Sequence, residues 1–460
     1  MGGEPMVACT VGDVAAPSRN SLVGGPFGSD LVSRDYVPSG VPVIRGTNMG
    51  HGRWVDGEFV FVSEQKAASL SANCARFGDL VFTQRGTIGQ VALIREKSAP
   101  RYLISQSQMK LSVDTSKADA LYLYYVFTSD EQQAYIRQNA IQTGVPHTNL
   151  GILRTTPIAL PSLATQKAIA KVLGALDDKI ELNRRMNATL EATARALFQS
   201  WFMDFDPVRA KLDGRTPAGY NEATAALFPD SVQDSDAGHI PSGWTVEPVG
   251  NVVECVGGGT PSTAEPMYWD GGTHHWTTPK DFSSLQSPVL VDTDRKLTRA
   301  GIAKISSGLL PAGTLLLSSR APVGYLAISA IPVAINQGFI ALKCNARASA
   351  YFMLNWCQTN MVEVESRATG TTFPEISKQN FRPIPVVLPP QELMAEFTRR
   401  VAPLYERITT NVFQSRTLAA LRDTLLPKLL SGELRVSALE STPAETDAES
   451  ATVRTRKPAP

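Results

Sequence analysis

The chain has 460 residues, of which 43% are hydrophobic and 19% charged, a composition that excludes a wholly disordered, collagen-like or purely coiled-coil protein. Its 44 basic and 43 acidic side chains give a net charge of +1, which excludes a strongly basic DNA-wrapping protein but leaves room for a local nucleic-acid site. The five cysteines are dispersed and lack CxxC spacing, no export signal is recognisable, and no apolar run approaches about 20 residues. We therefore expect a cytoplasmic protein that does not span a membrane.

Residues 1–160 are predicted to form a globular unit of mixed α and β structure. The apolar run Leu80 to Phe82 is typical of a strand, and Leu121 to Gln138 has the apolar spacing of a helix. Turn-rich loops separate these segments.

Residues 161–205 are predicted to form one long helix. Its apolar positions alternate in steps of four and three, which is the heptad spacing of a helix that packs along one stripe. The stripe consists of Ile169, Leu173, Leu176, Ile180, Asn183, Leu190 and Leu197, with Asn187 and Ala194 completing it. A helix from Ala164 to about Phe202 would be roughly 55 to 60 Å long, more than one DNA turn of about 34 Å.

The second half of the chain is predicted to repeat this organisation. Residues 206–239 read as an ordered-to-flexible connector, 240–388 as a second mixed α and β unit with a strand at Thr314 to Leu317, 389–436 as a second long helix, and 437–460 as a disordered tail. The stripe of the second helix is Phe397, Val401, Leu404, Ile408, Asn411, Leu418 and Leu425, completed by Ser415 and Arg422. Asn183 and Asn411 are polar stripe residues, which fix helix register at some cost in stability.

The repeat is visible in the sequence itself. The segment from Gly78 to Ile94 aligns without gaps on Gly313 to Ser329, pairing Arg85 with Arg320, and the helix stripes align at an offset that is a few residues smaller. If the two helices run antiparallel, a pseudo-twofold axis relates the halves, as suits a duplex ligand or a pair of identical partners.

Motifs of the common catalytic sites are not found. The glycine-rich stretch Gly257-Gly-Gly-Thr-Pro-Ser lacks the Gly-Lys-Ser/Thr ending of a phosphate loop, and neither a nucleophile elbow nor an HExxH sequence occurs. The pair His274-His275 has no third ligand at helical spacing, so we expect no metal site. The pattern favours a binding protein over an enzyme.

The order of motifs resembles the specificity subunit of type I restriction-modification enzymes over nearly the whole chain except the tail. The resemblance rests on the doubled Gly-Asp/Thr-Leu stretch with its arginine and second glycine, and on the following segments: Leu160-Pro-Ser-Leu-Ala-Thr-Gln-Lys-Ala-Ile-Ala, Leu176-Asp-Asp-Lys-Ile-Glu-Leu-Asn-Arg-Arg, Trp201-Phe-Met-Asp-Phe-Asp-Pro-Val-Arg-Ala-Lys, Ile240-Pro-Ser-Gly-Trp and Leu429-Leu-Ser-Gly-Glu-Leu. The second copy departs from the usual pattern after Leu388-Pro-Pro-Gln, and Pro403 lies where a proline can kink the helix.

The resemblance implies an α/β fold, mixed α+β, with two target-recognition domains separated by two long antiparallel coiled-coil helices. It implies that each domain reads one half of a split double-stranded DNA sequence. It also implies that the helices dock two methyltransferase subunits, that two motor-nuclease subunits can join, and that the chain contributes no catalysis. S-adenosylmethionine, ATP and magnesium are then expected on the partner subunits, and no cofactor on this chain.

Residue types that read base edges or hold phosphates gather in several predicted loops. The DNA-binding candidates are Arg45, Asn48, His51, Arg53, Arg85, Gln106 and Gln108 in the first unit, and Thr260, Ser262, His274, His275, Lys280, Arg320 and Gln337 in the second. Arg85 and Arg320 occupy equivalent repeat positions, which equally suits a shared structural arginine or a phosphate contact. The non-matching loops at Arg45 to Arg53 and His274 to Lys280 are better specificity candidates, and ordinary surface is the alternative for each.

The helices carry a second set of expectations. With the stripes paired inside the chain, the outward faces are left for partners: Arg184, Arg185, Glu191 and Phe198 on one helix, and Phe413, Arg416 and Leu421 on the other. A different class of function also remains open, because the near-zero net charge suits a scaffold that binds methyltransferase subunits without choosing a DNA sequence.

Overall fold

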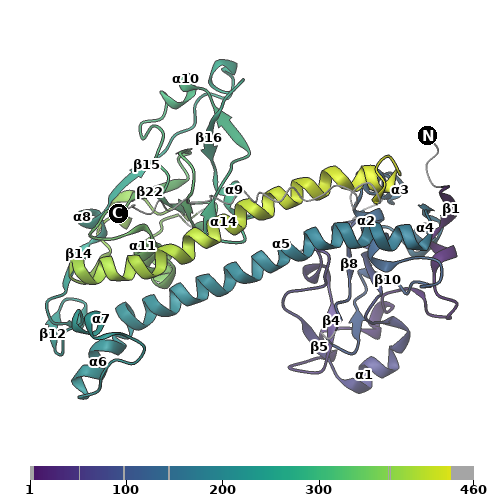
Figure 1. Ribbon diagram of the computed structural model, residues 1–460, viewed down its shortest axis with the longest axis horizontal. Helices are drawn as coiled ribbons and strands as arrows, with labels where there is room; N and C mark the ends of the chain where they lie inside the picture. Colours follow the sequence, from purple (N-terminus) through teal and green to yellow (C-terminus); the bar gives the residue numbers. More distant parts are fainter. Residues whose placement is uncertain are drawn as a thin grey trace, which may run out of the picture. The chain divides into compact units, whose positions relative to one another are not determined.

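The computed structural model describes residues 5–50, 52–96, 99–142, 146–370, 372 and 374–436. It divides into two compact units, Met1–Asp178 with Leu418–Pro460, and Lys179–Thr417. The division falls inside both of the long helices, α5 (Leu163–Phe198) and α14 (Gln391–Leu430), which are drawn in teal and yellow in Figure 1. Each unit therefore combines one globular part with a portion of each long helix. The predicted tail, 437–460, lies outside the described residues.

The globular part of the first unit is built on two sheets. A four-stranded sheet has the order β2-β10-β7-β8, and a five-stranded sheet has the order β3-β5-β4-β9-β6. The strands are β2 (Leu22–Gly24), β3 (Tyr36–Val37), β4 (Val41–Ile44), β5 (Val60–Val62), β6 (Cys74–Ala75), β7 (Leu80–Thr83), β8 (Val91–Leu93), β9 (Tyr102–Ile104) and β10 (Gln108–Leu111).

Short helices and one further strand pair complete this unit. The strand pair joins β1 (Val7–Thr10) to β11 (Pro157–Leu160), which leads into α5. The helices are α1 (Glu64–Ser69), α2 (Ala120–Thr128), α3 (Asp130–Asn139) and α4 (Leu150–Thr155). The single helix expected from Leu121 to Gln138 is two helices, because Ser129 leaves the helical conformation and its side chain accepts a hydrogen bond from the Gln132 amide as the N-cap of α3.

The globular part of the second unit also has two larger sheets, a five-stranded one in the order β15-β22-β19-β20-β17 and a three-stranded one in the order β18-β16-β21. Their strands are β15 (Glu254–Gly257), β16 (His274–Thr277), β17 (Val289–Leu290), β18 (Arg295–Leu297), β19 (Leu315–Ser319), β20 (Val323–Ser329), β21 (Val333–Ile335) and β22 (Phe339–Lys343). β14 (Thr245–Pro248) pairs with β23 (Pro385–Leu388), which leads into α14. The helices are α8 (Val249–Val252), α9 (Pro279–Phe282), α10 (Arg299–Ile302), α11 (Ala350–Thr359), α12 (Met361–Ser366) and α13 (Lys378–Phe381).

The sequence repeat is also a repeat of topology. The strand order β2-β10-β7-β8 recurs as β15-β22-β19-β20, and the antiparallel pair β1–β11 recurs as β14–β23. The parallel pair β4–β9 recurs as β16–β21, but the sheets around these two pairs differ in strand number and order. The two units thus share one sheet closely and diverge in the other.

A repeated glycine shows why some positions match between the copies. Gly89 and Gly324 both have positive φ, at 91° and 106°. A Cβ at Gly324 would lie 3.0 Å from the Met361 sulfur, and a Cβ at Gly89 would meet the side chain of Gln133. A strand end turns against a helix in both units, and only glycine combines this backbone with this close approach.

The long helices run antiparallel to each other within each unit. In the second unit Asn183 contacts Asn411, whereas Phe198, later in α5, contacts Phe397, earlier in α14, with ring centroids 6.2 Å apart. In the first unit Asp177 pairs with Arg422 at 2.7 Å, and Leu173, earlier in α5, belongs to the same core as Leu426. α14 continues through Pro403 without a break in helical structure. The prediction of two mixed α and β units with long helices is confirmed.

All residues of the two predicted stripes are buried or half-buried. Arg422 makes its ion pair with Asp177 from a stripe position. The helix ends in the second unit pack in an aromatic cluster in which Phe202 and Phe397 lie against Trp201 and Phe198 lies against Phe202.

The predicted ordered-to-flexible connector 206–239 contains regular secondary structure. It contains α6 (Asp206–Leu212), α7 (Glu222–Ala226) and a hairpin of β12 (Val232–Ser235) with β13 (Gly238–Pro241). Val208 and Phe228 belong to the core of the second unit, and Tyr220 accepts a hydrogen bond from the Trp201 indole at 2.8 Å. Burial of these apolar side chains orders a segment whose composition is typical of a loop.

None of the helices in the described part of the chain has the length and apolar character of a membrane-spanning segment.

Candidate nucleic-acid interface

Asn48 organises the predicted DNA-reading loop of the first unit from inside. It is fully buried, accepts a hydrogen bond from the Arg45 amide at 3.0 Å and donates to the main-chain oxygens of Asp56 and Glu58 at 3.2 and 2.8 Å. The prediction of Asn48 as a base reader is wrong, because its side-chain amide is buried and makes the hydrogen bonds that hold the loop together. Arg45 is half-buried, and His51 lies outside the described residues.

Arg53 fastens the same loop to helix α5. Only 7% of the residue is exposed, its guanidinium donates to the Gly174 carbonyl at 3.0 Å and pairs with Asp178, and Cζ lies 4.7 Å from the ring centroid of Trp54. Arg53 is therefore a structural residue of the first unit, and its prediction as a DNA contact is wrong. Its partners Gly174 and Asp178 lie more than a hundred residues away in the chain, where no local pattern could indicate them.

The two glutamines near β10 have different environments. Gln108 is fully buried and accepts a hydrogen bond from the Ser105 hydroxyl, so its prediction as a DNA contact is also wrong. Gln106 is exposed, although its side-chain amide donates to the main-chain oxygens of Gly28 and Leu31. Gln106 stays a prediction.

Arg85 and Arg320 keep their equivalence in the structure. Arg85 is exposed and forms an isolated bridge with His147, and Arg320 is half-exposed and forms the equivalent bridge with Glu375. The guanidinium of Arg320 also lies 3.5 Å from the Glu375 carboxylate. The shared backbone bridge fits a common structural position, and Arg85 in particular presents its side chain to solvent.

His275 is held in a charged cluster of the second unit. Its Nδ1 lies 3.2 Å from both the Thr293 hydroxyl and the Asp292 carboxylate, and Asp292 also pairs with Lys296 and with Arg416 of α14. Burial lowers the pKa of His275, and the Asp292 charge opposes this shift. The ring links β16 to the neighbouring loop through Nδ1, and His275 stays a prediction for DNA contact.

The other candidates of the second unit lie at or near the surface. Thr260 and Gln337 are exposed and hydrogen-bonded to each other, and Ser262 is exposed with its main-chain oxygen bound to the Trp269 indole at 2.9 Å. His274 is half-buried on β16. Lys280 is 84% exposed on its side chain and lies 3.4 Å from Asp294. These residues stay predictions for DNA contact.

Beside Ser262 the structure reveals a group that the sequence analysis missed. Arg295 lies on the rings of Trp269 and Trp276, with its Cζ 3.6 and 5.3 Å from their centroids, and Lys304 lies 5.7 Å from the ring centroid of Tyr268. The available signal was the segment 295–304, which carries four basic residues and no acidic one. The order of residues along the chain did not show that Arg295 and Lys304 lie close to Tyr268 and Trp269.

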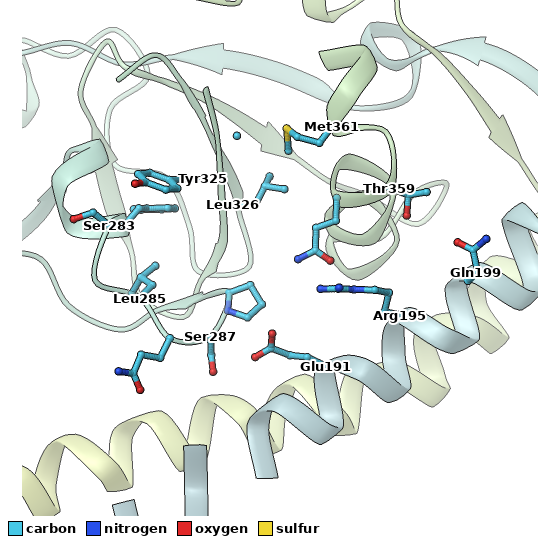
Figure 2. Close-up of a pocket in the computed structure, with 15 residues that line it drawn as sticks. Glu191, Arg195, Gln199, Ser283, Leu285, Ser287, Tyr325, Leu326, Thr359 and Met361 are labelled. Atoms are coloured by element: carbon cyan, nitrogen blue, oxygen red, sulfur yellow. The ribbon is translucent and has the colours of Figure 1, made fainter. Parts of the chain in front are cut away.

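A pocket of about 730 Å³ lies between α5 and the globular part of the second unit (Figure 2). Glu191 and Arg195 project from the helix, facing the loop that carries Ser283, Leu285 and Ser287. Burial raises the pKa of Glu191, whereas a hydrogen bond from Ser287 and the charge of Arg195 lower it in part.

Within the described ranges, no group of three His, Cys, Asp or Glu side chains could hold a metal ion.

The outward faces of the helices differ in part from the prediction. Phe198 is fully buried in the aromatic cluster of the second unit, so its assignment to a partner surface is wrong. Arg416 pairs with Asp292, and Glu191 lines the pocket. Phe413 and Leu421 are exposed by 43% and 46% and remain candidates for partner contact. Leu182 of α5, which was not predicted, is a further apolar side chain exposed by 48%.

The repeated units and helix pairs define a protein with two recognition modules built on long helices. The chain matches the family described as the type I restriction modification DNA specificity domain twice, over residues 35–192 and 241–410. It belongs to this family and is a specificity subunit of type I restriction-modification systems with two recognition domains. Its relatives are named as specificity subunits.

Individual relatives support this assignment over most of the chain. The HindI specificity subunit of Haemophilus influenzae is 25% identical over 78% of this chain and 86% of that protein. The MjaIX specificity subunit of Methanocaldococcus jannaschii is 24% identical over 82% of each. The solved type I restriction-modification S subunit from M. genitalium has a similar fold, with a TM-score of 0.56 at 17% identity over 93% of this chain and 97% of that one.

Proposed function

We propose that this chain selects a bipartite sequence in double-stranded DNA for a type I methyltransferase, with each unit reading one half-site. The observation that carries the proposal is the divergence of the two units: they share the sheet β2-β10-β7-β8, or β15-β22-β19-β20, but differ in the sheet around β4–β9 or β16–β21. A common frame with variable additions suits two domains that bind the same kind of ligand but distinguish different bases.

The helices are proposed to dock two methyltransferase subunits, to which two motor-nuclease subunits can bind. Leu182 and Phe413 of the second unit and Leu421 of the first expose apolar surface on α5 and α14, and such surface is typical of protein contacts. S-adenosylmethionine, ATP and magnesium would then be bound by those partners. Native mass spectrometry of the co-purified complex should give two methyltransferase subunits per chain, and a single one would contradict this stoichiometry.

A domain exchange tests the DNA-reading proposal. The chain is co-expressed with its methyltransferase, and methylated bases in the genomic DNA are mapped by single-molecule sequencing. Replacing residues 7–160 by the same segment of a relative should change one half of the methylated motif and leave the other half intact. An unchanged motif, or loss of any sequence preference while the complex still assembles, would instead support a scaffold that does not choose the sequence.

A further inference from the structure

The second unit carries a surface that combines basic and aromatic residues. We define it by Tyr268, Trp269, Trp276, Arg295, Arg299 and Lys304. The indole of Trp269 lies across that of Trp276, with centroids 5.1 Å apart and planes at 84°, and Arg295 stacks on Trp269 at 3.6 Å. The indole of Trp276 donates to the Gly259 carbonyl at 3.1 Å. These contacts join the 259–262 loop and Arg295 to the same pair of tryptophans.

Backbone contacts fix the rest of this surface to the same base. The Thr298 amide donates to the Tyr268 carbonyl at 3.0 Å, and the Thr298 hydroxyl donates to the Met267 carbonyl at 2.7 Å. Thr298 is also the N-cap of α10, which carries Arg299. Arg299 and Lys304 are exposed on or just after this short helix, so their positive charges lie beside the aromatic residues.

The cations of this surface are not paired with acidic side chains of the described residues. Several other cations of the second unit are paired: Lys280 with Asp294, Lys296 with Asp292, and Arg320 with Glu375. Arg295, Arg299 and Lys304 form no ion pair with any acidic group in the part of the chain that the structure describes. In a protein with a net charge of +1, exposed cations without partners are where an anionic ligand gains most.

Strand register shows that this surface belongs to the part in which the units diverge. In β4 of the first unit Val43 pairs with Leu103 and with Val60, and in β16 of the second unit Trp276 pairs with Ala334 and with Arg295. Trp276 therefore takes the place of Val43, and Arg295 that of Val60. Side chains that distinguish different half-sites must differ between the units, and this pair does.

An arginine on a tryptophan is not by itself a reader of bases, as the first unit shows. Arg53 also lies over an indole, but its guanidinium is buried and bound to the Gly174 carbonyl and Asp178. Arg295 is exposed, and its guanidinium makes no hydrogen bond or ion pair with the residues that the structure describes. A guanidinium oriented by stacking can donate two parallel hydrogen bonds to the O6 and N7 of guanine, the most frequent arginine contact in the major groove.

We propose that Arg295 reads a base pair, with guanine preferred, in the half-site of the second unit, and that Arg299 and Lys304 hold the adjacent phosphates. This assignment rests on the proposed function and names the side chains that perform it. Trp269 and Trp276 act as positioning residues, since they set the plane of the guanidinium. The two kinds of contact have different signatures: a lost base contact relaxes specificity at one position, whereas a lost phosphate contact weakens all sequences equally.

The test uses the complex with the methyltransferase and compares Arg295→Ala, Arg295→Lys, Arg299→Ala and Lys304→Ala with the wild type. Arg347→Ala is the matched control, because Arg347 is an exposed arginine of the same unit that pairs with Glu247. Methylated positions are mapped by single-molecule sequencing, and binding to the wild-type site and single-base variants is measured across salt concentrations. Thermal unfolding checks that each variant folds.

Complexes that contain either Arg295 variant should methylate a motif with one degenerate position in one half-site. Discrimination between bases at that position should fall roughly 5- to 150-fold. Lysine should not restore it, since an ammonium lacks the planar fork. Arg299→Ala and Lys304→Ala should keep the motif and lower the salt slope of binding by about one each. Arg347→Ala should match the wild type.

Three results would overturn the assignment. An unchanged motif in both folded Arg295 variants would exclude a base contact there. Uniform weakening without relaxation would make Arg295 a phosphate contact. If the wild-type complex itself methylates no bipartite motif, the proposed function fails and the assignment fails with it, whereas a wild-type motif that is insensitive to Arg295 overturns only the assignment.

Discussion

Asn183 of α5 donates from its side-chain amide to the main-chain oxygen of Asn411 of α14 at 3.4 Å, although 228 residues separate the two in the chain. The two asparagines are equivalent members of the sequence repeat, so the same residue of each copy meets its counterpart inside the second unit. Asn183 also donates to Gln414 and Ser415, at 2.9 and 3.2 Å, and Asn411 donates to Asn187 at 2.8 Å. Together they form a buried polar layer between the stripes of the two helices in the second unit, and such a layer favours one helix register over others.

Asn411→Leu should destabilise the second unit by about 1 to 3 kcal/mol, because it leaves the buried Asn187 oxygen without its donor. Unfolding followed by tryptophan fluorescence suits this test, since five of the six tryptophans lie in the second unit. Phe413→Leu, a change at a partly exposed position of the same helix, should have little effect. Equal unfolding midpoints for Asn411→Leu and the wild type would remove the polar layer as a stabilising element.

Arg53→Ala should destabilise the first unit by about 2 kcal/mol, because it removes a charged hydrogen bond to the Gly174 carbonyl together with the stacking on Trp54. Trp54 is the single tryptophan of that unit, so its fluorescence reports the change directly. Lys117→Ala removes an exposed cation of the same unit and should cost less than about 0.5 kcal/mol. If Arg53→Ala and Lys117→Ala have the same unfolding midpoint, Arg53 does not anchor the loop.

Glu191→Gln should raise the melting temperature at neutral pH, because burial raises the pKa of Glu191 and makes its charged form unfavourable in the folded state. The folded protein then holds this proton more tightly than the unfolded chain, so the wild type loses stability as pH rises from the ordinary glutamate range through the raised pKa. The advantage of the variant should therefore shrink toward pH 4 or below, where the unfolded chain also protonates this group. A difference independent of pH would contradict this origin.

Gly324→Ala should cost more than Gly308→Ala. Both glycines have positive φ, so alanine at either position is strained by about 1 kcal/mol or more. A Cβ at Gly308 meets open space, whereas one at Gly324 lies 3.0 Å from the Met361 sulfur and must displace helix α12 or that side chain. The difference between the two variants in chemical unfolding reports this close approach together with the higher φ of Gly324, 106° against 60°, and equal midpoints would show that neither adds to the cost of a positive φ.

The units and long helices follow from the sequence because their signals are local or periodic. The stripe from Ile169 to Leu197 needs only the helical period to be recognised, and the match of Gly89 with Gly324 needs only self-comparison. The sequence did not reveal that the connector is folded, because the cores that order Val208 and Phe228 are assembled from distant segments.

The DNA-contact candidates show where sequence reasoning ends. Residue type alone selected Asn48, Arg53 and Gln108, since polar side chains in loops are suited to base contacts, but whether such a group is free depends on what packs over it. The partner of Arg53 lies 121 residues away at Gly174, and Arg295 meets Trp269 only because β16 and β18 pair. The sequence by itself thus determined the repeat, the helices and the family, because these depend on period and order along the chain. Only the tertiary structure decided which charges are consumed internally and which remain open to a ligand, because burial and pairing are set by residues that are remote in sequence.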